Sequence, residues 1–361
     1  MKKLERLLSG LLAAALLLSL SACGQKTDPQ TGSSPNNPPP SSQQSGSADG
    51  WPVLEGDTVT IINAYSGDAT LPHGHSAELF KSLVEEHSNG KILVKNYENN
   101  SLGDDATVTE SVQTGDVTMA MAVTSVLGNF VPEMAVFDMP MALTDIDGAY
   151  ALLKDSQFRD ILNTACETNG FKLLGMLPTS FRETSSNKAV RSFNDFSGLR
   201  IRTLDNKYHR AFWNAIGTSP TTVAFSELYM ALEQGVVDAQ ENPLSTIYTS
   251  KFYEQQDYII KTNHIMFTLC YYANNSWWNS LDADYQQCIL MAMEQALDGT
   301  VDFAKEVEEN SIAALEAEGV EIVELDDATI EQMKSAASDA YDLVRGDLGD
   351  EIVDALLDGI Q

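Results

Sequence analysis

Basic residues are scarce in this chain of 361 residues. Its 22 lysines and arginines stand against 52 aspartates and glutamates, which gives a formal net charge of −30 at pH 7. Nucleic-acid binding depends on lysine and arginine contacts to phosphates, so this acidic excess excludes it. A small anion is not excluded as a ligand, because charges more than about 10 Å away are screened at ordinary salt. A local arginine cluster can still dominate one cleft.

Cysteine is also sparse. Besides Cys23, the chain has only Cys166, Cys270 and Cys288. Their wide spacing matches neither a zinc motif nor a redox motif. We expect all three to be buried thiols rather than members of a disulfide.

The signatures of common catalytic sites are missing. The chain has no phosphate-binding loop, no Gly-x-Ser-x-Gly and no His-Glu-x-x-His. His73 and His75 are separated by one residue and have no clear third ligand, so we interpret them as structural histidines beside Pro72. The sequence therefore predicts a binding protein without cofactor or metal, not an enzyme.

The long hydrophobic run at residues 7–20 follows basic residues at positions 2, 3 and 6. A membrane helix needs about 20 apolar residues, so this run predicts a signal peptide over residues 1–22. The run ends in Leu-Ser-Ala-Cys at positions 20–23, which looks like a bacterial lipobox. We expect Cys23 to carry a lipid; a plain secretory signal with an incidental cysteine is the alternative.

Residues 23–50 are rich in Ser, Gly, Pro, Asn and Gln and contain almost no apolar side chains. Such a segment cannot bury enough surface to fold, so we expect a lipid-anchored tether on the extracytoplasmic face of the cell membrane. No second long apolar run follows, so the chain is not itself a membrane pore. The remaining residues, about 310, are enough for two domains.

Strands and helices alternate from residue 58 onward. The predicted strands are residues 59–61, 92–94, 117–122, 171–177, 199–203, 221–224, 236–240, 268–276 and 320–323. The predicted helices are residues 76–87, 107–113, 205–216, 227–234 and one long helix near 282–318, with a C-terminal segment at 330–357. Asp205 and Ser226 are the expected helix caps, and Gly217 an expected helix end. The alternation indicates an α/β fold with a parallel sheet.

Three side chains fall at the carboxyl ends of predicted strands, where ligands of parallel sheets bind. They are Arg202, Phe225 and Asn242. Strand alternation puts Arg200 and Arg202 on one face, and Arg202 lies nearer the crevice. A guanidinium binds a carboxylate through two parallel hydrogen bonds, so the three residues predict a pocket for a small organic anion. The alternative for Arg202 is a structural ion pair with one of the many acidic residues.

Six segments carry a further pattern. They are residues 101–105 (SLGDD), 182–188 (RETSSNK), 195–202 (DFSGLRIR), 217–220 (GTSP), 224–229 (AFSELY) and 235–243 (GVVDAQENP). In order and spacing they resemble the solute-binding receptors of tripartite ATP-independent periplasmic (TRAP) transporters. That group contains the dicarboxylate and sialic-acid receptors.

The resemblance implies a two-lobed periplasmic-binding-protein fold with a hinge and a long helix across both lobes. We expect one lobe from residues 51–180 and 268–307, and the other from residues 181–267 and 308–361. It also implies that Arg202 fixes the ligand carboxylate, with Arg182 nearby. Asn242 would contact a carboxylate or hydroxyl and Phe225 would pack on the ligand, whereas Asp205 would contact a hydroxyl or only cap a helix.

Ala106 stands where the sialic-acid receptors carry an arginine, and Val123 where they carry an acidic residue, so sialic acid is not the expected ligand. The prediction is a monomeric, lipid-anchored receptor that delivers a C4-dicarboxylate or sugar acid to TRAP membrane subunits. A ligand-binding sensor for a membrane kinase is the alternative. A surface hydrolase or lyase is a third reading, for which the sequence offers no catalytic pair.

Overall fold

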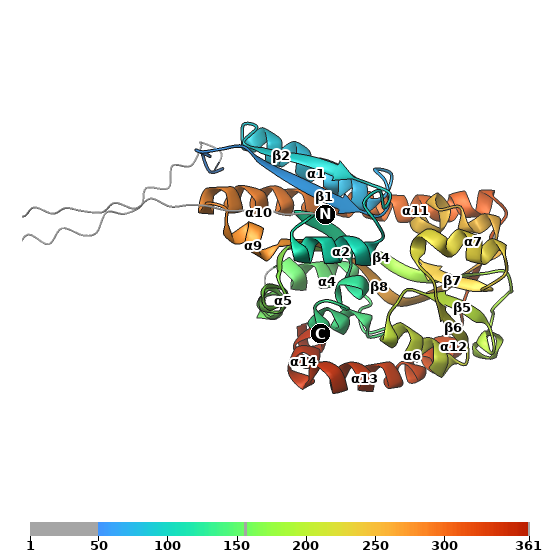
Figure 1. Cartoon of the computed structure of the whole chain (residues 1–361). Helices are drawn as coiled ribbons and strands as arrows, with labels where there is room; N and C mark the ends of the chain where they lie inside the picture. The colour runs from blue at the N-terminus through green and yellow to red at the C-terminus, as the bar shows by residue number, and fades with distance from the viewer. Residues whose placement is uncertain (1–49, 155–156, 360–361) are drawn as a thin grey trace, which may run out of the picture. The chain divides into compact units, whose positions relative to one another are not determined.

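The computed structural model describes residues 50–154 and 157–359. Within these residues nine strands form one sheet in the order β2-β1-β3-β8-β4-β7-β5-β6, and β9 pairs with β8 (Figure 1). The strands are β1 Val59–Tyr65, β2 Ile92–Tyr97, β3 Met119–Val123, β4 Phe171–Ser186, β5 Arg200–Thr203, β6 Ser219–Thr222, β7 Ala239–Asn242, β8 Tyr258–Asn274 and β9 Glu321–Glu324. The predicted signal peptide and most of the predicted tether, including Cys23, lie outside the described residues.

Helices connect and cover these strands. The α-helices are α1 Pro72–His87, α2 Asp105–Thr114, α3 Thr124–Leu127, α4 Ile146–Lys154, α5 Gln157–Thr168, α6 Lys207–Ile216, α7 Leu228–Glu233, α8 Leu244–Thr249, α9 Asn275–Asn279, α10 Ala283–Asp298, α11 Val301–Ala317, α12 Asp327–Ala336, α13 Ser338–Leu348 and α14 Asp350–Gly359. The 3-10 helices are η1 Pro132–Asp138, η2 Phe193–Phe196, η3 Phe225–Glu227 and η4 Phe252–Glu254. None of the helices in the described part of the chain is both long and apolar enough to cross a membrane.

The sheet is mixed, so the prediction of a parallel sheet is wrong for the sheet as a whole. β1 runs parallel to β2 and β3, and β5 runs parallel to β6 and β7. In contrast, β8 is antiparallel to β3 and β4, and β4 is antiparallel to β7. The two parallel sets are joined through β4 and β8, whose direction the local alternation of strands and helices does not reveal.

β4 and β8 are long strands of 16 and 17 residues. They pair with each other along most of their length and lie between the parallel strands β1–β3 and the parallel strands β5–β7. The sequence predicted only residues 171–177 and 268–276 as strand. β4 contains Gly175 and Pro178, which are typical strand breakers. The structure accommodates them with register shifts between Leu173 and Gly175 and between Pro178 and Ser180. Such shifts in register interrupt the pairing locally without ending the strand.

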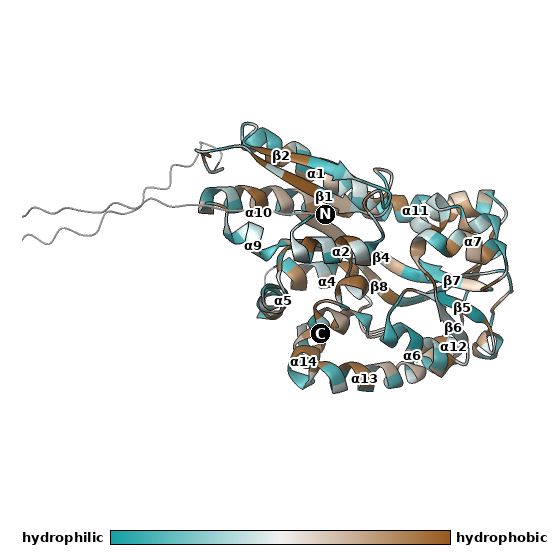
Figure 2. Cartoon of the chain, viewed as in Figure 1, coloured by the Kyte–Doolittle hydropathy of each residue, from teal (hydrophilic) through white to brown (hydrophobic). Residues whose placement is uncertain are grey.

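Helices cover both faces of the sheet at each parallel set, and we call the two resulting units the first and second lobes. In the first lobe, α1 and α10 pack on one face of β1–β3, around Phe80 and Ile289, and α5 and η1 pack on the other, around Leu162 and Met134. In the second lobe, α6 and α12 pack on one face of β5, and α7, α8 and α11 form a separate core with β8. Figure 2 shows both polar and apolar residues on most helices, as expected for helices that cover a sheet.

The predicted long helix at residues 282–318 is divided into α10 and α11, which follow each other in Figure 1. The break falls at Gly299 and Thr300. A Cβ atom on Gly299 would lie 2.7 Å from Cδ2 of Leu79 in α1, so a larger residue would require the Leu79 side chain to move. The Thr300 hydroxyl donates a hydrogen bond to the Ala296 carbonyl. α10 packs on the first lobe and α11 on the second.

The chain passes between the lobes again near its end. α12 contributes Met333 to the core of the second lobe, whereas Val353 and Leu356 of α14 pack with Phe158 of α5 in the first. The division of the chain into residues 51–180 with 268–307, and 181–267 with 308–361, stays a prediction. Cys166, Cys270 and Cys288 are buried free thiols, as expected.

Candidate ligand-binding site

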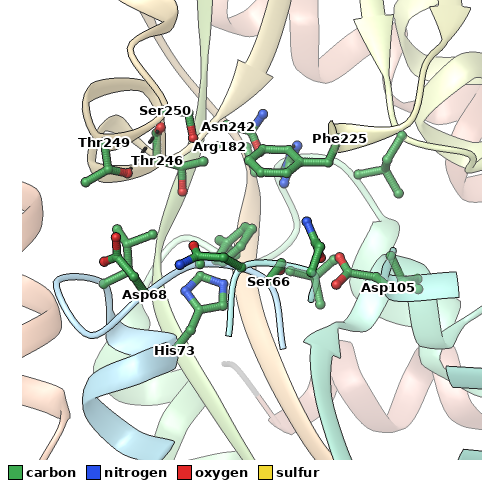
Figure 3. A pocket seen from close by; sticks show the side chains of 18 of the residues that line it. Ser66, Asp68, His73, Asp105, Arg182, Phe225, Asn242, Thr246, Thr249 and Ser250 are labelled. Carbon is green, nitrogen blue, oxygen red and sulfur yellow. Dashed lines mark hydrogen bonds between the residues drawn. The ribbon is translucent and has the colours of Figure 1, made fainter. Parts of the chain in front are cut away.

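A cavity of about 190 Å³ lies between the two lobes. The first lobe contributes the segments that follow β1 and β2 and the beginnings of α1 and α2. The second lobe contributes residues of β4, β5, β7, η3 and α8. The polar and aromatic residues that line the cavity are Ser66, Asp68, His73, Asn99, Asn100, Asp105, Arg182, Arg202, Phe225, Asn242, Thr246, Thr249, Ser250 and Phe267. Figure 3 shows Ser66, Asp68, His73 and Asp105 on one side of the cavity and Arg182, Phe225, Asn242 and Thr246 on the other.

Arg202 is 2% exposed and lines the cavity. Its Nε donates to the Val223 carbonyl at 2.9 Å, and neither Nη atom has a hydrogen-bond partner among the described residues. Burial lowers the pKa of Arg202 to about 10, and the charge of Arg182 also lowers it. The charges of Glu241 and Asp105 oppose this shift. The guanidinium therefore stays cationic at neutral pH, with its two terminal nitrogens uncommitted.

Its neighbour on the same strand has a different environment. The Arg200 side chain is 48% exposed and its Nη2 lies 2.6 Å from Oδ1 of Asp238. The two arginines that the sequence places on one strand face are thus separated by burial, and only Arg202 reaches the cavity.

Arg182 lies within β4, which extends beyond the predicted strand at residues 171–177, and is 3% exposed. Its Nε and Nη2 bind the Glu241 carboxylate, and Nη2 also donates to Oδ1 of Asn242 at 3.1 Å. The guanidinium carbon lies 5.6 Å from the ring centroid of Phe267. The charge of Arg182 is therefore compensated within the protein.

Glu241 is fully buried behind the cavity. Burial alone would raise the pKa of Glu241, but Arg182, His209 and His264 together hold it well below its usual range. His264 Nε2 lies 3.2 Å from Oε2 of Glu241, and His209 Nδ1 lies 3.8 Å from Oε1. Glu241 is thus an anion that fixes the position of Arg182.

His209 connects this group to the first lobe. Its Nε2 lies 3.0 Å from Oδ1 of the buried Asp138, which also accepts hydrogen bonds from Ser125 and Asn206. Burial lowers the pKa of His209, but Asp138 and Glu241 outweigh it and raise the pKa above its ordinary value. A continuous polar network therefore extends from Arg182 in β4 to Asp138 in η1.

Asn242 is the last residue of β7 and is held on both sides of its amide. Its Oδ1 accepts from Arg182, and its Nδ2 donates to Oε1 of Gln240 at 2.5 Å. Phe225 begins η3, lines the cavity and packs edge-on against Phe252 with ring centroids 5.9 Å apart. Asn242 thus lies at the end of a strand as expected, whereas β6 ends at Thr222, three residues before Phe225.

Asp205 does not line this cavity. Its side chain is 78% exposed and pairs with Arg210 at 2.8 Å. The cap of α6 is Asn206, whose Oδ1 accepts from the backbone N–H groups of Tyr208 and His209, so the predicted cap is wrong by one residue. Ser226, the other predicted cap, lies inside η3 and makes no cap hydrogen bond. A ligand contact by Asp205 stays a prediction.

Sequence reasoning missed the first-lobe wall of the cavity. Ser66 and Asp68 follow β1, and Asn99 and Asn100 follow β2. Arg202 and Asn242 were predicted because they are polar residues at the carboxyl ends of strands. The same rule would have found these four residues as well. His73, predicted to be a structural histidine beside Pro72, is buried at the start of α1 and lines the cavity.

Comparison with known proteins gives the family. The model of bacterial extracellular solute-binding proteins, family 7, matches residues 64–346. A solute-binding protein of Verminephrobacter eiseniae is 32% identical, over 70% of this chain and 75% of that protein. A C4-dicarboxylate-binding periplasmic protein of Vibrio cholerae is 29% identical, over 84% of this chain and 91% of that protein.

Among solved structures, the sugar acid binding protein of Advenella mimigardefordensis in complex with galactonate superposes with a TM-score of 0.80. It is 26% identical, over 84% of this chain and 98% of that one. These proteins are binding receptors rather than enzymes, and the two-lobed α/β fold is the same. The chain belongs to family 7 of the bacterial extracellular solute-binding proteins, the solute receptors of TRAP transporters.

Proposed function

We propose that the protein captures a small organic acid and that Arg202 binds its carboxylate. The supporting observation is the environment of this one side chain. Arg202 is 2% exposed and has a single hydrogen bond, to Val223. A buried cation without a carboxylate in direct contact is costly, and a ligand carboxylate would supply both the charge and two acceptor oxygens for the uncommitted Nη atoms.

The neighbouring side chains would complete the carboxylate site. Asn242 is held between Arg182 and Gln240, so its amide is oriented before any ligand arrives. Arg182 adds positive potential, although Glu241 compensates most of it. The ring of Phe225 offers an apolar surface for the carbon chain of the ligand.

The ligand class follows from the chemistry of the cavity and from the relatives. A C4-dicarboxylate and a sugar acid each bring the carboxylate that Arg202 requires, and the names of two relatives given above include these classes. The cavity of about 190 Å³ is below the roughly 300–1,000 Å³ of pockets for drug-sized molecules, which supports a compact ligand. Val123 lines the cavity, and it is the residue at which the resemblance implied an acidic side chain in the sialic-acid receptors.

We also propose that the two lobes close on the ligand by bending β4 and β8. The closed receptor would then dock on the membrane subunits of a TRAP transporter, held near them as a monomer by a lipid on Cys23 and the tether that follows. The register shifts in β4 support bending between the lobes.

A thermal-shift screen of the mature protein against small carboxylates tests this function, because a ligand that binds only the folded state raises the unfolding midpoint. We expect one or more acids to raise the midpoint, whereas the corresponding primary amides leave it unchanged. Equal shifts from an acid and its amide would contradict the carboxylate assignment.

A further inference from the structure

The two walls of the cavity differ in charge. The second lobe presents Arg202 and Arg182, and Glu241 compensates Arg182. The first lobe presents Asp68 and Asp105, and among the described residues no lysine or arginine of that lobe lines the cavity. Arg202 is thus the guanidinium of the cavity that makes no direct ion pair with a described carboxylate, and two carboxyl groups lie on the other side.

The charged side chains of the first-lobe wall are carboxylates, and Ser66, Asn99 and Asn100 add neutral groups that both donate and accept. Oδ1 of Asp68 accepts from the backbone N–H of Thr70 at 2.9 Å and from its hydroxyl, which fixes the carboxylate and leaves Oδ2 available. Asp105 adds a second carboxyl group. A ligand hydroxyl can donate to these carboxylates, whereas a second anion would meet like charge there.

His73 adds an unsatisfied polar atom to this wall. The side chain is 6% exposed, and its Nδ1 has no hydrogen-bond partner in the described part of the chain. A buried polar atom without a partner is unusual, because it loses its hydrogen bond to water without replacement. Burial lowers the pKa of His73 to about 4 against the opposing charge of Asp68, so the ring is neutral and can exchange a hydrogen bond with a ligand hydroxyl.

We infer that the cavity selects a hydroxylated monocarboxylate over a dicarboxylate of the same length, with the ligand hydroxyls on Asp68 and His73. This inference depends on the proposed function, in which Arg202 holds the carboxylate. The second carboxylate of a dicarboxylate would face Asp68 and Asp105 in a partly desolvated space without a cation of its own. Hydroxyl groups at the same place would donate to Asp68 and satisfy Nδ1 of His73.

Two pairs of acids of equal chain length test the inference by calorimetry on the mature protein. D-erythronate and succinate have four carbons, and galactonate and adipate have six; the first of each pair has one carboxylate and several hydroxyls, the second two carboxylates. We expect a hydroxy acid to be the tightest ligand, by roughly tenfold or more over its dicarboxylate partner, since one unpaired buried polar group or like-charge contact is worth about that factor.

Variants assign the selection to named side chains. Asp68→Asn keeps an acceptor for Thr70 but removes the charge. The ratio of the affinity for the hydroxy acid to that for its dicarboxylate partner should therefore fall at least about threefold. His73→Ala should weaken the hydroxy acid about tenfold and leave the dicarboxylate unchanged. His75→Ala is the matched control, because His75 contacts Thr300 and Phe303 instead of the cavity.

The outcomes separate this inference from the function beneath it. A dicarboxylate as the tightest ligand, or a preference that Asp68→Asn and His73→Ala do not change, would overturn the inference and leave a carboxylate receptor. Failure of every acid of both classes to bind would overturn the proposed function as well.

Discussion

Arg182 and Glu241 form a buried ion pair directly behind the cavity. β4 and β7 are antiparallel neighbours, and their register places Glu183 opposite Asn242 and Thr184 opposite Glu241. The guanidinium thereby reaches the carboxylate and the backbone carbonyl of Glu241 as well as Asn242. Because His209 and His264 contact the same carboxylate, one anion organises three nitrogen-bearing side chains.

Glu241→Gln should therefore strongly destabilise the protein. It keeps the shape of the side chain but removes the anion beside a buried guanidinium, and breaking a buried pair in this way costs about 3–5 kcal/mol. Urea unfolding followed by circular dichroism measures the loss. The matched control is Glu321→Gln, which removes an exposed pair with Arg191 and should cost at most about 1 kcal/mol. Similar losses in the two variants would contradict the central role of Glu241.

Arg202→Ala should weaken ligand binding by about 3–5 kcal/mol, or roughly 10²- to 10³-fold or more, because the bound carboxylate would be desolvated without a partner. Arg202→Lys should also bind poorly, since an ammonium cannot replace the planar fork of the guanidinium. Calorimetry with the tightest acid found measures both.

Arg200→Ala is the control for these variants, because Arg200 lies on the same strand but pairs with Asp238 outside the cavity. It should bind the acid normally. Near-normal affinity in Arg202→Ala would remove the proposed carboxylate site.

The sequence predicted the local part of this fold well. β5, α6 and the end of α6 at Gly217 depend on nearby residues: Gly217 has a φ of 94°, a left-handed conformation that ends the helix as expected. The direction of β4 and β8 and their passage through both lobes depend on pairing between residues about 90 positions apart, such as Leu177 with Leu269. No local pattern carries that information.

The candidate site divides in the same way. Arg202, Phe225 and Asn242 come from segments in which a strand end and a motif coincide. Glu241 also lies within such a motif, but the sequence gives no role for it. Its three partners come from β4, α6 and β8, which are far apart in the chain. His73 was interpreted as a structural histidine ahead of the helix predicted from residue 76, whereas α1 begins at Pro72 and includes it.

Ligand affinity should rise as the pH falls from about 7.5 to 5.5. Burial raises the pKa of Asp105 to about 6, a hydrogen bond from Ser66 and the charge of Arg202 oppose this rise, and Asp104 adds to it. A bound anion favours protonated Asp105, so binding takes up a proton and becomes tighter at lower pH. Aliphatic carboxylic acids with ordinary pKa values stay mostly ionised across this range.

The raised pKa of Asp105 also makes the stability of the folded protein depend on pH. The direction of this dependence is opposite to that of a salt-bridged carboxylate, whose pKa is lowered. The folded state without ligand holds the Asp105 proton more tightly than the unfolded chain, whose ordinary value is 3.8. The contribution of Asp105 to stability is therefore lost as the pH rises from about 4 to about 6.

The pH dependence of ligand affinity is tested with the Asp105→Asn variant. Calorimetry of this variant between about pH 5.5 and 7.5 should show a smaller change in affinity with pH than the unaltered protein does. An unchanged slope would assign the proton to another group.

Gly74→Ala should damage the first-lobe wall of the cavity. A Cβ atom on Gly74 would lie 2.3 Å from the backbone oxygen of Asp68 and 2.5 Å from the backbone nitrogen of Ala69, so the segment that carries Asp68 must move. We expect a loss of about 1–3 kcal/mol in unfolding free energy and weaker binding of the acid. Gly346→Ala in α13 is the control, because no atom lies within 4 Å of its added methyl group and alanine is the better helix former. Should Gly74→Ala match this control in stability and affinity, the close packing of α1 on the segment at Asp68 would not be what shapes the cavity.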